Sequence, residues 1–88
     1  MANTPIARIH KALEKEFSPR EIELKRTKSG SITGWITSDS FDGQEEIERM
    51  QRVFKLLDKN LSAEDRERVS VIWPITRLER KVLLEDEE

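Results

Sequence analysis

Residues 31–61 read SITGWITSDSFDGQEEIERMQRVFKLLDKNL, and the spacing of their hydrophobic residues changes part-way along. In residues 31–38, Ile32 and Ile36 share one face, while Trp35 and its threonine neighbours share the other. This alternation is the two-residue period of a β-strand. Further on, apolar residues recur every three or four positions, at Ile47, Met50, Phe54, Leu57 and Leu61. This second period predicts an amphipathic helix over residues 43–59, so the stretch predicts a strand followed directly by a long helix.

The segment before the first strand has the features of another helix. Thr4 is a good N-cap, and Pro5 suits the first helical position because that position needs no N–H donor. One apolar stripe follows, formed by Ile6, Ile9, Leu13 and Phe17. Ser18 precedes Pro19 and should end the helix, since a residue before proline avoids the α region.

Residues 21–27 alternate like a strand, with Ile22 and Leu24 on one face. Lys28-Ser29-Gly30 then forms a turn signal between this run and residues 31–38. The two runs therefore predict a β-hairpin. If Ile32 and Ile36 face the core, Trp35 lies on the opposite surface of the sheet.

The ends of the long helix and the segment after it can also be predicted. Asp42 followed by Glu45 resembles a capping arrangement, and Lys59-Asn60 suits a helix end. Residues 62–66 predict a short capped helical turn. Residues 69–75 predict a strand that has Trp73 on the same face as Val69 and Val71, which places Trp73 in the core. For residues 77–84 a short helix is preferred, although their alternation is also compatible with a strand.

This order predicts an α+β fold of type α-β-β-α-β-(α). Because a helix connects the second and third strands, they should run parallel, through a right-handed crossover. We expect a three-stranded mixed sheet with helices on one face and the other face open. A single domain should cover residues 1–84, and residues 85–88 should form an acidic, disordered tail.

Composition narrows the classes of function. The chain has 88 residues, no cysteine and a net charge of −2, so disulfides and thiolate metal sites are excluded. The absence of disulfides in so small a domain favours a reducing compartment, and the cytoplasm is the predicted location. No apolar run reaches the roughly 20 residues that span a bilayer, so no membrane contact is expected.

Residues for catalysis are scarce. His10 is the single histidine, and its place beside Ile9 on the flank of a helix favours a boundary role. The three glycines are scattered and form no phosphate-binding loop. The sequence therefore predicts a protein that is not an enzyme and that binds no metal or other cofactor.

Binding residues are more prominent. An exposed Trp35 on a strand could stack on a nucleic-acid base or serve as a protein hot spot, although it could also pack under the C-terminal segment. Lys25, Arg26 and Lys28 cluster around the hairpin turn, where they could contact a phosphate or an acidic partner, or simply be solvated.

A further pattern resembles a known family. The family shows a serine at the end of the second strand, a Phe-x-Gly motif, an arginine and a Val-aromatic-x-x-Leu run. Here the matching residues are Ser38, Phe41, Gly43, Arg49, Val53, Phe54 and Leu57. With Phe17-x-Pro19 and Ile75-Thr76 as weaker matches, the chain resembles the BolA family of small proteins related to type II KH domains.

The resemblance implies an adaptor that pairs with a monothiol glutaredoxin and shares an iron–sulfur cluster through a histidine before the last strand. Here Arg68 occupies that position, and arginine has no lone pair to offer a metal. The preferred hypothesis is therefore a BolA-like adaptor that binds a protein or nucleic acid without a metal, as a monomer or weak homodimer. The alternatives are an iron–sulfur partner of glutaredoxin, a KH-like nucleic-acid binder and a dimerising structural domain. The expected partner-binding residues are Lys25, Arg26, Lys28, Trp35, Phe41, Gly43, Arg49 and Arg68.

Overall fold

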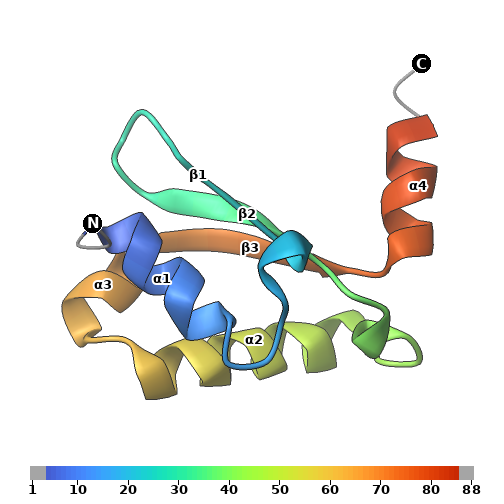
Figure 1. Ribbon diagram of the computed structural model, residues 1–88, viewed down its shortest axis with the longest axis horizontal. Helices are drawn as coiled ribbons and strands as arrows, with labels where there is room; N and C mark the ends of the chain where they lie inside the picture. Colours follow the sequence, from blue (N-terminus) through green and yellow to red (C-terminus); the bar gives the residue numbers. More distant parts are fainter. Residues whose placement is uncertain (1–3, 86–88) are drawn as a thin grey trace.

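A computed structural model describes residues 4–85 of the chain (Figure 1). The main elements in chain order are α1 (Pro5–Leu13), β1 (Ile22–Arg26), β2 (Ile32–Thr37), α2 (Glu46–Asn60), α3 (Ala63–Glu67), β3 (Val69–Ile75) and α4 (Arg77–Glu85). Two 3₁₀ turns, η1 (Pro19–Glu21) and η2 (Asp39–Phe41), lead into β1 and out of β2. The predicted α+β order is confirmed, including the C-terminal helix that was preferred over a strand.

The three strands form one mixed sheet in the order β1-β2-β3. β1 and β2 are antiparallel and make the predicted hairpin, whereas β2 and β3 are parallel. Figure 1 shows α1, α2 and α3 on one side of the sheet, while α4 projects away from them at one end of it. The opposite face of the sheet, beside α4, is not covered by α1–α3.

The core lies between the sheet and the first two helices. Its fully buried side chains are Ile9, Leu13, Ile32, Ile36, Phe41, Val53, Leu57 and Ile72. The N-cap of α1 is confirmed, because the Ala7 N–H donates to the Thr4 hydroxyl at 3.2 Å. Helix α1 ends at Leu13, before the predicted stop at Ser18. Phe17 therefore lies in the turn after the helix, and its side chain is buried there.

Helix α2 starts later than predicted. Its N-cap is Glu45, not Asp42, and the Glu45 N–H donates to the side chain of Glu48 at 3.3 Å. Asp42 instead ends the η2 turn, where its N–H donates to the Asp39 carbonyl. Ile47, the first apolar residue of the predicted stripe, is exposed, and the buried residues of α2 are Val53 and Leu57.

Trp73 was predicted in the core, and this was wrong. The register pairs Ile32 with Val69 but Gly34 with Ile72, so β3 contains one extra residue at this point. Such a bulge reverses the alternation of the strand. Ile72 and Pro74 therefore point into the core, and Trp73 points out of it.

The predicted acidic tail is only partly within the described residues. Glu85 is the last residue of α4 and is therefore helical, and residues 86–88 lie outside the described range. The short helix predicted over residues 62–66 is confirmed as α3, whose N-cap Ser62 accepts from the Asp65 N–H at 3.2 Å.

Candidate interaction site

The uncovered side of the sheet presents two tryptophans side by side. Trp35 on β2 is the register partner of Trp73 on β3, and their ring centroids lie 6.1 Å apart with the planes tilted by 33°. Trp35 is 39% exposed and Trp73 is 40% exposed. We call the surface formed by Trp35, Trp73 and their outward neighbours Glu23, Lys25 and Thr33 the open face.

Helix α4 borders the open face and is anchored mainly through polar contacts. Thr76 and Glu79 form a capping box: the Glu79 N–H donates to the Thr76 hydroxyl at 3.2 Å, and the Thr76 N–H donates to the Glu79 carboxylate at 2.9 Å. Arg80, the residue after Glu79, donates to Glu23 on β1 and to the Thr37 hydroxyl on β2. These contacts fix the start of α4 against the end of the sheet.

The apolar side chains of α4 are not used in this anchoring. No residue of α4 is buried, and Leu78 is 71% exposed. Three other large apolar residues of the helix, Val82, Leu83 and Leu84, are also exposed. A helix of nine residues is only marginally stable in water by itself, so an uncovered apolar side is unusual.

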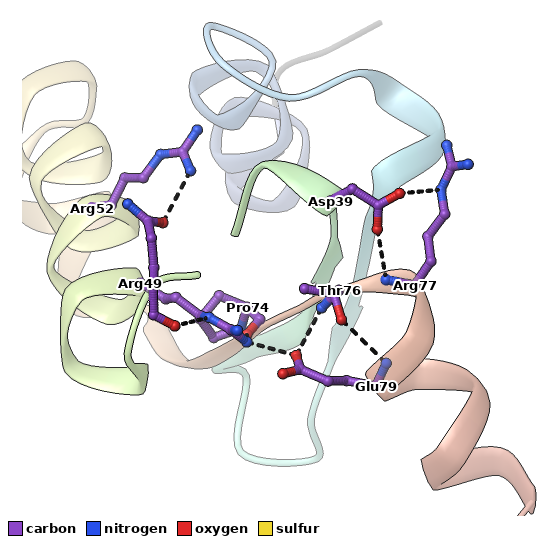
Figure 2. Close-up of polar contacts among 8 residues, drawn as sticks. Asp39, Arg49, Arg52, Pro74, Thr76, Arg77 and Glu79 are labelled. Carbon is purple, nitrogen blue, oxygen red and sulfur yellow. Dashed lines mark hydrogen bonds and ion pairs between the residues drawn. The ribbon is translucent and has the colours of Figure 1, made fainter. Parts of the chain in front are cut away.

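Arg49 ties α2, β3 and α4 together beneath this surface (Figure 2). Its guanidinium donates to the Gln44 carbonyl at 2.9 Å, to the Pro74 carbonyl at 3.4 Å and to Glu79 at 2.6 Å. The side chain of Arg49 is only 12% exposed. Because the Pro74 carbonyl is satisfied by Arg49, this part of the outer edge of β3 is less available for pairing with another strand.

Two carboxylates that hold α4 against the sheet, Glu79 and Glu23, have lowered pKa values. The hydrogen bond from Arg49, with a further one from the Thr76 N–H, holds the pKa of Glu79 below its ordinary value. The hydrogen bond from Arg80 does the same for the pKa of Glu23. Both carboxylates are therefore charged at neutral pH and hold α4 in place.

A groove runs between β3 and α4. Its apolar walls are formed by Trp73, Pro74, Ile75, Leu78, Val82 and Leu83. Gln44 and Glu46 form part of its polar rim. The open face and this groove share Trp73, so the apolar walls of the groove adjoin the tryptophan pair.

The residues predicted at the hairpin separate in the structure. Lys25 lies on the open face, where it is the register partner of Thr33. Arg26 pairs with Ile32 and belongs to the other side of the sheet, while Lys28 is exposed in the turn. Of the three cations, only Lys25 shares a face with Trp35.

The residues predicted from the Phe-x-Gly stretch have mainly structural surroundings. Phe41 is fully buried against Phe17, with ring centroids 5.3 Å apart. Gly43 is exposed in the loop before α2. Arg49 holds the junction of α2, β3 and α4, where it pairs with Glu79 and not with the neighbouring Glu45 and Glu46. Arg68 is the C-cap residue of α3. It lines a groove between α1 and α3, which is separate from the groove beside Trp73 and α4.

Within residues 4–85, no three His, Asp or Glu side chains lie close enough together to hold a metal ion. His10 is half-buried, and its Nδ1 atom lies 2.7 Å from the carboxylate of Glu14, the C-cap residue of α1.

None of the helices in the described part of the chain is long and apolar enough to cross a membrane.

No family model, curated protein or solved structure matches this chain. The resemblance to the BolA family therefore rests on the sequence residues quoted above.

Sequence reasoning missed Trp73, Arg80 and the exposed side of α4. The bulge in β3 had no sequence signal that distinguishes it from a regular strand, so Trp73 was assigned to the wrong face. The signal for α4 was present, because Leu78 and Val82 are four residues apart, but spacing alone does not tell which apolar stripes find a partner in the chain.

Proposed function

We propose that this chain is a non-catalytic, BolA-like adaptor module that binds a protein partner across the open face and the apolar side of α4. The observation that carries the proposal is the exposed Trp35–Trp73 pair, which is continuous with the groove beside α4. Tryptophan is the residue type most enriched at protein-binding hot spots.

The surroundings of the tryptophans favour a protein over a nucleic acid. A single-strand binder combines stacking aromatics with a positively charged track for the phosphates. Here the open face carries Lys25 beside the ion pair of Glu23 with Arg80, and Glu46 lies on the rim of the groove. The exposed leucines and valine of α4 also suit an apolar protein surface.

The family resemblance supplies a first candidate partner, a monothiol glutaredoxin. Arg68 stands where the family's ligand histidine is expected, so the proposed contact involves no shared cluster. The same resemblance and the absence of cysteine underlie the proposal that the protein works in the cytoplasm.

An NMR titration of the ¹⁵N-labelled protein tests this proposal. Three ligands are added in turn: a monothiol glutaredoxin, a duplex DNA and a single-stranded oligonucleotide. The chain has two tryptophans, both on the open face, so their two indole N–H signals report on this surface alone.

We expect glutaredoxin to shift both indole signals together with the amides of α4. If the single strand shifts the indoles instead, and added salt abolishes the shifts, the open face binds nucleic acid and the protein-binding proposal fails. If the signals change only with the concentration of the protein itself, the partner is a second copy. If none of these changes occurs, the transfer of function from the family should be abandoned.

A further inference from the structure

Lysines gather on the side of the molecule opposite to the open face. Lys11 lies near the end of α1 and Lys15 lies in the turn that follows it, while Lys55 and Lys59 lie one turn apart on α2. Figure 1 shows α1 and α2 next to each other beneath the sheet, away from α4. We call these four lysines and the surface between them the basic band.

The basic band lies along two adjoining grooves. The first groove, between α1 and α3, is lined by Lys11, Lys15 and Leu61. The second, between the end of α1 and α2, is lined by Lys15, Lys55, Leu56 and Lys59. Lys15 and Asn60 line both grooves, so the two form one continuous depression.

The charge of this surface differs from that of the whole chain. The two grooves are lined by seven basic and three acidic residues, a local net charge of +4, whereas the whole chain carries −2. Two of the three acidic residues already have cationic partners, since Asp65 pairs with Arg8 at 2.6 Å and Glu16 lies 3.6 Å from Arg52. In the described residues, the four lysines of the band make no ion pair.

The grooves also offer apolar contact. Leu56 and Leu61 are half-buried against the core and still reach the grooves. A binding surface with leucines between rows of lysines is complementary to an amphipathic segment that has carboxylates on its flanks and apolar residues at its centre.

We infer that the basic band is a second docking site, which takes an acidic amphipathic segment of a partner protein. Two observations favour this ligand over a nucleic acid. The grooves contain no aromatic side chain for base stacking, and they include apolar leucines that a phosphate backbone would leave uncovered. Together with the open face, this site would let one small domain hold two proteins on opposite sides.

The test measures fluorescence anisotropy of labelled peptides with the full chain. The main probe is a peptide of about 14 residues, rich in glutamate, with two leucines four positions apart. A second peptide has the same composition with the leucines moved to opposite sides, and a third has glutamine in place of glutamate. A labelled duplex DNA is the fourth probe.

Two double variants with equal changes of charge are compared. K15E/K59E reverses two charges in the basic band, and R20E/K81E reverses two exposed cations outside both the band and the open face. We expect K15E/K59E to weaken binding of the main peptide by more than about tenfold and R20E/K81E to change it by less than about twofold. K15Q/K59Q, which adds no negative charge, should weaken it by about fivefold, and thermal unfolding of each variant checks the fold.

Several results would overturn the inference. Equal losses in both charge-reversed variants would mean unspecific attraction, and equal binding of the rearranged peptide would mean that the leucines play no part. Tighter binding of duplex DNA, lost in the same variants, would assign the band to nucleic acid. Tryptophan emission should stay unchanged during peptide binding, because both tryptophans lie on the open face, so this test and the test of the proposed function fail independently.

Discussion

Replacing Gly34 by alanine adds one methyl group against the backbone of β1, opposite Leu24 in the hairpin. A Cβ atom on Gly34 would lie 1.9 Å from the backbone oxygen of Glu23 and 2.9 Å from the Leu24 side chain. Contacts shorter than 3.0 Å are essentially never made by real Cβ atoms. The nearest obstacle is backbone, which cannot rotate away, so β1 must move by about 1 Å.

This movement disturbs the pairing of Leu24 with Gly34 at the centre of the hairpin. Overpacking costs about 1–3 kcal/mol, and each weakened ladder hydrogen bond costs about 1 kcal/mol more. We therefore expect G34A to lower the free energy of unfolding by about 3 kcal/mol. For a domain of this size, that corresponds to a fall in Tm of about 12–24 °C.

G43A is the matched control. Gly43 has a φ of +82°, where alanine is strained, but nothing lies within 4 Å of its added Cβ atom. Its cost should be about 1 kcal/mol, from the backbone conformation alone. Urea unfolding monitored by circular dichroism compares the two variants, and the explanation is refuted if G34A is no less stable than G43A.

Three further outcomes follow from the ion pairs and the open face. R49M removes three hydrogen bonds at the junction of α2, β3 and α4, so it should lower the free energy of unfolding by about 2 kcal/mol and speed amide exchange in α4. R77M, which removes an exposed ion pair, should lower the free energy of unfolding by less than about 0.5 kcal/mol. Equal losses in the two variants would contradict the role of Arg49. The hydrogen bond from Arg8 lowers the pKa of Asp65, so its stabilising effect is present above the ordinary value of 3.8 and is lost as the pH falls through the lower folded pKa. D65N should therefore be less stable than the unaltered protein at pH 7 in urea unfolding, and the difference should vanish at strongly acidic pH; a difference that persists there would reject the ion pair as its cause. Acrylamide should quench the emission of W35F and W73F to similar extents, because the remaining tryptophan in each is about 40% exposed, and a strongly protected tryptophan in either variant would show that the open face is covered.

Local periodicity was enough to predict most of the fold. The strand period around Ile32 and Ile36, the helix period around Val53 and Leu57 and the turn at Gly30 all act over a few residues, so the chain order could be derived from them. The parallel pairing of β2 and β3 followed from the helical crossover.

Features that depend on contacts between distant residues were not predictable in the same way. The bulge in β3 arises where its register is fitted to β2, and it moved Trp73 from the core to the surface. The partner of Arg49 is Glu79, thirty residues away on α4, whereas the sequence offered nearer carboxylates. The basic band likewise joins lysines from α1, the turn after it and α2, which only the tertiary structure brings together.

The most direct test of the open face as a docking surface is tryptophan fluorescence during titration with a monothiol glutaredoxin whose binding is followed separately through an attached dye. Because both tryptophans lie on the open face, a partner seated there must shield them from water. We predict that their emission shifts to shorter wavelength and that acrylamide quenching falls as the dye signal saturates. Saturation of the dye signal with unchanged tryptophan emission and quenching would contradict the proposal, because the partner would then be bound elsewhere on the molecule.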